Sequence, residues 1–144
     1  MIGYLDTSAF IPLLIGEPSS RACRRFWDVA DAVVSSRLLY VESAAALAQA
    51  ERMGRIRKAQ HAASRNLLDS LWSQIEIAEV DEPLVLSAAE LAETLALRGH
   101  DAVHCAAAAQ LDAPDLVAAS GDQRLLGAWK SLGIATFDTN APDE

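Results

Sequence analysis

Short apolar runs alternate with longer segments rich in Ala, Leu, Arg and Glu along the whole chain. Five of the apolar runs have the length and residue types of buried strands. They span residues 2–5, 32–35, 75–80, 116–119 and 134–137. The segments between them contain strong helix formers and predict helices. Strands that alternate with helices predict an α/β fold in which a central, mostly parallel five-stranded sheet lies between two layers of helices.

Several residues mark helix ends. Asp81 and Pro83 are typical of a helix start, and we expect Gly99 to end that helix. Gly133 is expected to end the last helix in the same way. No internal repeat, low-complexity tract or long linker divides the 144 residues, so the pattern predicts a single domain over residues 1–144.

The composition favours a globular intracellular protein. Hydrophobic residues make up 51% of the chain, which is too many for a disordered polypeptide. Cys23 and Cys105 are too few for a disulfide framework or a zinc cluster. No segment has the pattern of a signal peptide, and no apolar run reaches the roughly 20 residues of a membrane span. We therefore expect a cytoplasmic protein without a membrane association.

The formal net charge of -8 disfavours indiscriminate binding of nucleic acid through a general positive field. A local basic segment departs from this balance, because residues 52–68 contain no acid. The segment suits either a solvated helix face or a surface that tracks phosphate groups beside an acidic site. The candidate RNA-binding residues are Arg52, Arg55, Arg57, Lys58 and Arg65.

Two carboxylates follow predicted strands directly. Asp6 ends the first apolar run, and Asp122 comes shortly after the fourth. In parallel α/β sheets, ligands bind beyond the carboxyl ends of the strands, where both acids are expected. Each acid also has a purely structural interpretation, because an aspartate between a strand and a helix often caps the helix.

Two further carboxylates lie within predicted helices. Glu42 stands in the very apolar segment LLYVESAAALAQA, so we expect it to be partly buried and to need a partner. Asp101 stands in LRGHDAVHCAAAAQ, where it is either a first-turn acid favoured by the helix dipole or a group drawn inward by close packing of the alanines.

Four acids in one pocket repel one another unless cations lie among them. Ligation by oxygen alone favours Mg²⁺ or Mn²⁺, ions that polarise a phosphate and activate a water for attack on it. Supporting hydroxyls are expected from Thr7, Ser8 and Ser120. The spacing of His100 and His104 also suits zinc, but no third nitrogen or sulfur ligand lies nearby, so packing is the better interpretation.

Four segments, DTSAF, VESAAAL, HDAVHCAAA and SGDQRLL, resemble in order and spacing the four signatures of PIN-domain ribonucleases. The chain length resembles that of VapC-type toxins of toxin–antitoxin pairs. The resemblance implies a PIN-like three-layer α/β/α fold and metal-dependent endoribonuclease activity. It also implies that one or two Mg²⁺ or Mn²⁺ ions are held by Asp6, Glu42, Asp101 and Asp122.

The same resemblance implies partners. It predicts an RNA substrate, a homodimer, and a cognate antitoxin whose C-terminal segment wraps the toxin and blocks its site. Some relatives carry a further acid three residues after the fourth motif, where this chain has Leu125, so no further carboxylate is expected there.

Two other functions are compatible with parts of the pattern. A PIN-like interaction module without catalysis would keep the fold, but this chain retains all four acids. An aspartate phosphotransfer domain would also place an acid after the first strand. A phosphatase of that kind needs a second aspartate two residues later, where Ser8 stands.

Overall fold

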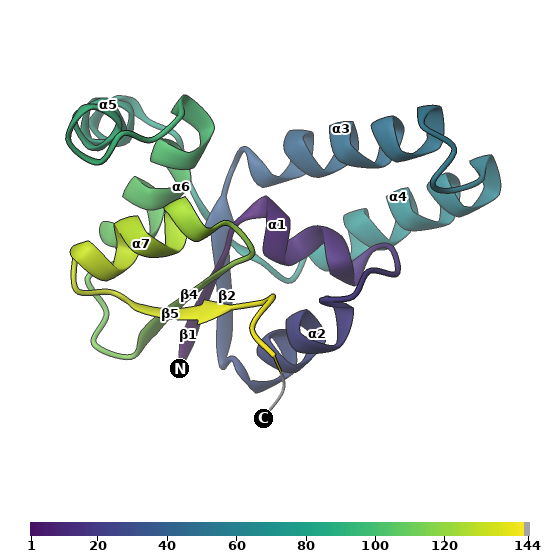
Figure 1. The fold of residues 1–144 in the computed structure, drawn as a ribbon, viewed down its shortest axis with the longest axis horizontal. Coiled ribbons are helices and arrows are strands. Elements are labelled where there is room, and N and C mark those ends of the chain that lie inside the picture. Colours follow the sequence, from purple (N-terminus) through teal and green to yellow (C-terminus); the bar gives the residue numbers. More distant parts are fainter. Residues whose placement is uncertain (143–144) are drawn as a thin grey trace.

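The structure is a computed structural model that describes residues 1–142, and its centre is one five-stranded sheet (Figure 1). The strands lie in the order β3-β2-β1-β4-β5, and every neighbouring pair is parallel. They are β1 (Ile2–Leu5), β2 (Ala32–Ser36), β3 (Glu76–Ala78), β4 (Leu116–Ser120) and β5 (Ala135–Asp138). The predicted α/β fold is confirmed, with a sheet that is parallel throughout and a β3 shorter than expected.

Helices cover both faces of the sheet and complete the three layers (Figure 1). One face packs against α5 (Glu82–Leu95), α6 (Gly99–Ala109) and α7 (Gln123–Ser131). The opposite face packs against α1 (Thr7–Phe10), the 3₁₀ helix η1 (Ile11–Leu13), α2 (Ser20–Val29), α3 (Leu39–Arg52) and α4 (Lys58–Trp72). The helices α3 and α4 form a hairpin that extends beyond the sheet (Figure 1).

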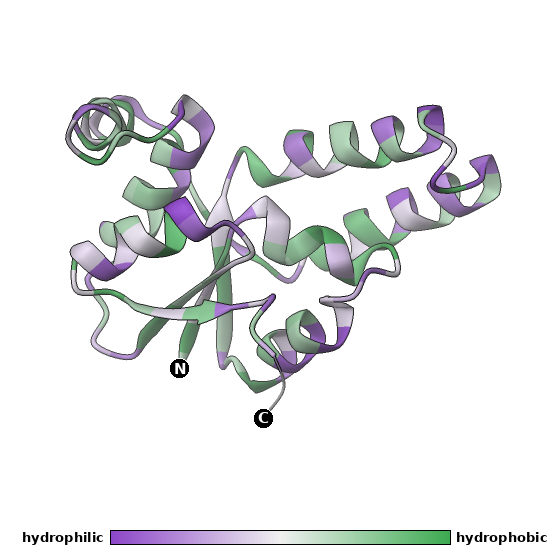
Figure 2. Ribbon diagram, in the orientation of Figure 1, coloured by the Kyte–Doolittle hydropathy of each residue, from purple (hydrophilic) through white to green (hydrophobic). Residues whose placement is uncertain are grey.

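The two faces of the sheet bury two separate apolar cores. Successive side chains of a strand point to opposite faces, so Tyr4 enters one core and Leu5 the other, both fully buried. Trp129 of α7 is fully buried edge-on against Tyr4, with ring centroids 5.8 Å apart. Figure 2 shows the hydrophobic strands between the two layers. Within residues 1–142, no helix has the length and apolar character required to span a membrane.

The end of α5 differs from the prediction. Gly99 starts α6, whereas α5 ends at Leu95 and Ala96 adopts the left-handed conformation with φ 54° and ψ 45°. This conformation costs a residue with a Cβ atom about 1 kcal/mol, and the buried Leu97 anchors the turn that follows. Gly133, with φ 80°, does lie at the end of α7 as expected.

The strand order creates a crevice at the carboxyl edge of the sheet. β1 lies at the centre, and its neighbours β2 and β4 lie on opposite sides of it. The connections that leave β1 and β4 therefore diverge to opposite faces, and such a switch point is the usual ligand site in parallel α/β sheets.

Candidate active site

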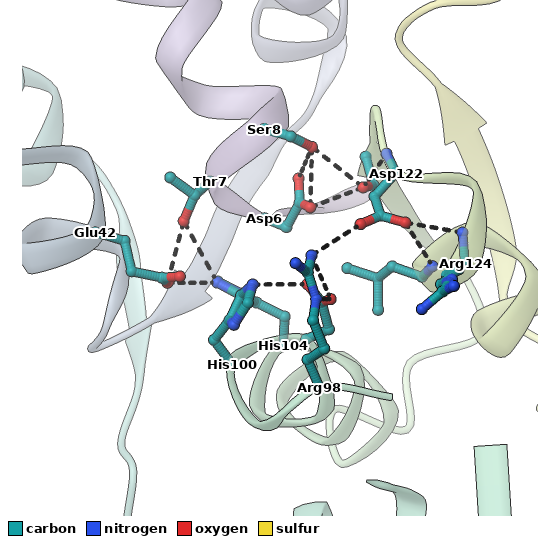
Figure 3. Close-up of polar contacts among 12 residues, drawn as sticks. Asp6, Thr7, Ser8, Glu42, Arg98, His100, His104, Asp122 and Arg124 are labelled. Atoms are coloured by element: carbon teal, nitrogen blue, oxygen red, sulfur yellow. Dashed lines mark hydrogen bonds and ion pairs between the residues drawn. The ribbon is translucent and has the colours of Figure 1, made fainter. Parts of the chain in front are cut away.

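The structure brings all four predicted carboxylates to one cavity of about 430 Å³ at this switch point. Asp6 directly follows β1, and Asp122 lies two residues beyond β4. Glu42 and Asp101 lie in the first turns of α3 and α6. Figure 3 shows the side chains of three of these acids together with their hydrogen-bond partners.

Asp6 is both a helix cap and a cavity residue. Its Oδ1 accepts a hydrogen bond of 3.0 Å from the backbone N–H of Ala9, so the capping interpretation is correct. Ser8 Oγ lies 2.8 and 3.0 Å from its two oxygens, and Ser120 Oγ donates to Oδ2 at 2.7 Å. Burial raises the pKa of Asp6, although His104 and the two serine hydroxyls oppose that rise.

Asp122 divides two roles between its two oxygens. Oδ1 caps α7 by accepting from the backbone N–H groups of Arg124 at 2.8 Å and Leu125 at 3.4 Å. Oδ2 faces the cavity, 3.8 Å from Nη2 of Arg98 (Figure 3). The helix cap therefore leaves one oxygen of Asp122 available to a ligand in the cavity.

A hydrogen bond joins the two loops that carry these acids. The N–H of Gly121 donates to Ser8 Oγ at 2.8 Å and so joins the loop after β4 to the one after β1. A Cβ atom at Gly121 would lie 2.9 Å from Nδ2 of Asn140 and 3.1 Å from Oγ1 of Thr139, so the segment after β5 also packs closely against this loop.

Glu42 is held by a chain of hydrogen bonds that starts in the core. His104 Nε2 lies 2.8 Å from Glu42 Oε1, and Thr7 Oγ1 donates to the same oxygen at 3.1 Å. On the far side of the ring, His104 Nδ1 lies 2.7 Å from the Tyr4 hydroxyl. The side chain of Glu42 is 22% exposed, as its apolar sequence context predicts.

The protonation of this chain follows from its surroundings. Burial raises the pKa of Tyr4 well above its usual value, so the hydroxyl keeps its proton beside Nδ1 of His104. An ionised carboxylate can only accept, so Nε2 of His104 donates the hydrogen bond to Glu42. Burial alone would raise the pKa of Glu42, but the hydrogen bond and attraction of His104, together with Thr7, lower it overall. Glu42 is therefore held as a carboxylate.

Asp101 is 6% exposed and interacts with a cation that the sequence interpretation missed. Nε and Nη2 of Arg98 each lie 3.2 Å from its Oδ2, and His100 Nε2 lies 3.4 Å from its Oδ1. Since Arg98 also approaches Asp122, its guanidinium lies between two of the four acids. The separation of three residues between Arg98 and Asp101 in a helical first turn could have indicated this pair.

The histidines and cysteines do not form a zinc site. His100 points to Asp101, whereas the buried His104 points to Glu42, so the two rings serve different acids. Cys23 and Cys105 are buried free thiols, and burial raises the pKa of each to about 11. Within residues 1–142, no three histidine, cysteine, aspartate or glutamate side chains are already grouped around one metal position.

The family profile of the PIN domain matches residues 3–128, a segment that contains all four acids. The chain belongs to the PIN-domain family. It is 39% identical over 122 residues to ribonuclease VapC45 of Mycobacterium tuberculosis, a match that covers 85% of each protein.

Two solved structures share the fold of this PIN domain. FitAcB from Neisseria gonorrhoeae is 21% identical with a TM-score of 0.72, and the match covers 96% of this chain and 98% of that one. A toxin–antitoxin complex from Klebsiella pneumoniae is 16% identical with a TM-score of 0.56, and the match covers 80% and 83% of the respective chains. At these identities the likeness concerns the fold alone.

The cavity of the PIN domain has the chemistry of a hard divalent cation site. Four carboxylate side chains line it, and the guanidinium of Arg98 lies between two of them, Asp101 and Asp122. Mg²⁺ often binds proteins through one or two carboxylates and keeps several waters, so it does not require a preformed cluster of three ligands. The residues present therefore fit Mg²⁺ or Mn²⁺.

The basic residues singled out from the sequence do not border the cavity. Arg52 ends α3, and the helical rise places it about 15 Å along the axis from Glu42. Three others, Arg55, Arg57 and Lys58, lie at the same tip of the α3–α4 hairpin, where Figure 2 shows hydrophilic segments. This tip group is Arg52, Arg55, Arg57 and Lys58.

Arg65 is separate from the tip group and faces an aromatic ring. Its guanidinium lies 5.7 Å from the ring centroid of Tyr40, and Nη2 donates to the Tyr40 hydroxyl at 3.1 Å. Arg55 forms an ion pair of 3.3 Å with Glu17, which reduces its free positive charge. A role of these five basic residues in RNA binding stays a prediction.

Proposed function

We propose that this PIN domain is a metal-dependent endoribonuclease that acts as the toxin of a toxin–antitoxin pair. The observation that carries the proposal is the convergence of four carboxylates on one cavity at the carboxyl edge of the sheet. The 39% sequence identity to a protein named ribonuclease VapC45, over 85% of each chain, supports the same reaction class. The reaction proposed is hydrolysis of phosphodiester bonds in RNA.

The proposed metal ligands are Asp6, Glu42, Asp101 and Asp122. A bound Mg²⁺ or Mn²⁺ would polarise a phosphate oxygen and lower the pKa of a water that attacks phosphorus. Ser8 and Ser120 hold the Asp6 carboxylate by hydrogen bonds, and Thr7 and His104 hold that of Glu42. Because these partners restrict rotation of both carboxylates, the protein maintains their direction before substrate arrives.

The metal requirement is tested by RNA cleavage with purified protein. Cleavage of single-stranded or looped RNA is expected in Mg²⁺ or Mn²⁺, because the carboxylates need a cation to bring an anionic phosphate into the cavity. EDTA is expected to stop the reaction, and excess Mn²⁺ to restore it. An Asp6→Asn protein purified in the same way is the control for contaminating nucleases and should be inactive. If that control is inactive, full activity of the wild-type protein in EDTA would contradict the metal mechanism.

The toxin role includes a protein partner. We propose a cognate antitoxin that blocks the cavity, a homodimeric toxin, and action in the cytoplasm. An antitoxin that inserts a basic side chain among the acids would satisfy their charge by short, charge-assisted hydrogen bonds. A structure of the complex in which the acidic cavity stays open would contradict this mode of inhibition.

Growth of a bacterial host tests the toxin role directly. Expression of the wild-type chain without its antitoxin is expected to arrest growth, because RNA cleavage stops protein synthesis, and co-expression of the antitoxin is expected to restore it. Asp6→Asn provides the control for burden of expression. Normal growth in the native host with intact, soluble wild-type protein would argue against a toxin.

A further inference from the structure

Arg98 is the single arginine or lysine that lines the acidic cavity among residues 1–142. It is the N-cap residue of α6, and its backbone is extended there, with φ -68° and ψ 158°. Its side chain makes no capping hydrogen bond and instead reaches across the cavity mouth (Figure 3). The guanidinium can therefore move without breaking the helix start.

We propose that Arg98 is an internal counter-cation that competes with the divalent metal for Asp101 and Asp122, and that it binds the RNA phosphate once displaced. This inference rests on the metal-dependent nuclease function proposed above. The Arg98 side chain would occupy two positions in turn. Before metal binds it contacts Asp101 and Asp122, and after metal binds it contacts the RNA phosphate. The same side chain would then weaken metal binding and promote cleavage.

The first position is suited to exchange. Both nitrogens that approach Asp101 lie 3.2 Å from the same oxygen, and the contact to Asp122 is longer at 3.8 Å. The Arg98 side chain is 64% exposed, so water screens these contacts and the pair is weak. A divalent cation carries twice the charge of a guanidinium and can displace it, whereas the buried Leu97 keeps the backbone in place.

The second position follows from charge and shape. The protein has a net charge of -8 and its cavity holds four acids, so an approaching phosphate needs positive groups at the cavity mouth. The tip group of the α3–α4 hairpin is too distant to supply them at the scissile bond. Arg98 is within a side chain's length of Asp101 and Asp122, and a guanidinium can bind two phosphate oxygens at once.

The test measures Mn²⁺ affinity by calorimetry and RNA cleavage at saturating Mn²⁺ for the same proteins. Arg98→Ala is expected to bind Mn²⁺ about fivefold more tightly, since it removes a competing exposed ion pair. It is expected to lose roughly tenfold in kcat/KM, because the phosphate loses a charged donor at a partly exposed position. A purely structural role would weaken both properties, so the opposite signs distinguish the inference.

Two further variants complete the test. Arg98→Lys keeps the charge but not the planar fork, so Mn²⁺ affinity should stay close to wild type while cleavage falls. Arg21→Ala removes one positive charge from an exposed site on α2 and should change neither measurement. Thermal unfolding in EDTA verifies that each variant is folded.

The outcomes separate this inference from the proposed function. Suppose that the wild-type protein binds Mn²⁺ and cleaves RNA, but the Mn²⁺ affinity of Arg98→Ala is unchanged or weaker. That result overturns the inference about Arg98 and leaves the proposed function intact. If Arg98→Ala cleaves RNA with the kcat/KM of the wild type, the proposed contact of Arg98 with the RNA phosphate is overturned. A wild-type protein that neither binds Mn²⁺ nor cleaves RNA overturns the proposed function and this inference together.

Discussion

Asp6→Asn is expected to lower RNA cleavage about 10³-fold, which corresponds to about 4 kcal/mol in the activation barrier. The substitution removes one negative charge from the proposed metal site but keeps the size of the side chain. Its amide oxygen can still accept from the N–H of Ala9, and its amide nitrogen can donate to Ser120 Oγ, so the cap of α1 survives. Cleavage of a labelled RNA at saturating Mn²⁺ measures the loss.

The same variant is expected to be more stable than wild type in EDTA at neutral pH. Burial raises the pKa of Asp6 above 3.8, so without metal the folded protein disfavours the ionised carboxylate more than the unfolded chain does. Below pH 3.8 the group is neutral in both states and costs nothing. The cost develops as the pH rises from there to the folded pKa, so the gap in unfolding free energy between variant and wild type should widen over this interval.

Asp81→Asn is the matched control for both measurements. Asp81 caps α5 by accepting from the N–H of Leu84 at 3.0 Å, as Asp6 does for α1, but it is exposed and does not line the cavity. Its variant should cleave RNA at the wild-type rate and show no stability gain in EDTA. Addition of Mn²⁺ should stabilise wild type and Asp81→Asn but not Asp6→Asn.

The sequence predicts the fold well because the fold is built from local patterns. Each strand is an apolar run between segments of good helix formers, and this alternation requires a parallel sheet covered on both faces. The positions of Asp6 and Asp122 follow from the same pattern, since Asp6 comes directly after β1 and Asp122 comes two residues after β4. The error at the end of α5 has a physical cause, because tertiary packing around Leu97 holds Ala96 in a conformation for which glycine is the usual residue.

The interactions inside the cavity were beyond sequence patterns because they join distant elements. His104 touches Tyr4, 100 residues earlier, and Glu42, 62 residues earlier, so only the folded sheet and helices bring these groups together. The cluster of basic residues between 52 and 68 was visible in the sequence, but its distance from the acids depends on the direction of the α3–α4 hairpin. The contact of Arg98 with Asp122 likewise requires the loop after β4.

Asp101→Asn is expected to lower RNA cleavage by about 10²-fold, or about 2.7 kcal/mol, with a parallel loss of Mn²⁺ affinity. The physical reason is the loss of one ligand charge from a nearly buried position. In EDTA the free energy of unfolding should change by less than about 1 kcal/mol, because the lost attraction to the helix dipole and Arg98 is offset by relief of repulsion among the acids. RNA cleavage in Mn²⁺ and thermal unfolding in EDTA are measured on the same preparation.

Glu82→Gln separates the two interpretations of Asp101, because Glu82 is the first-turn acid of α5 and lies outside the cavity. It should lose a similar fraction of a kcal/mol of stability through the helix dipole, and it should cleave RNA at the wild-type rate. If Asp101→Asn behaves like Glu82→Gln in both measurements, Asp101 is only a first-turn acid. The proposed metal site would then consist of Asp6, Glu42 and Asp122, and Arg98 would face a structural acid on one side of the cavity.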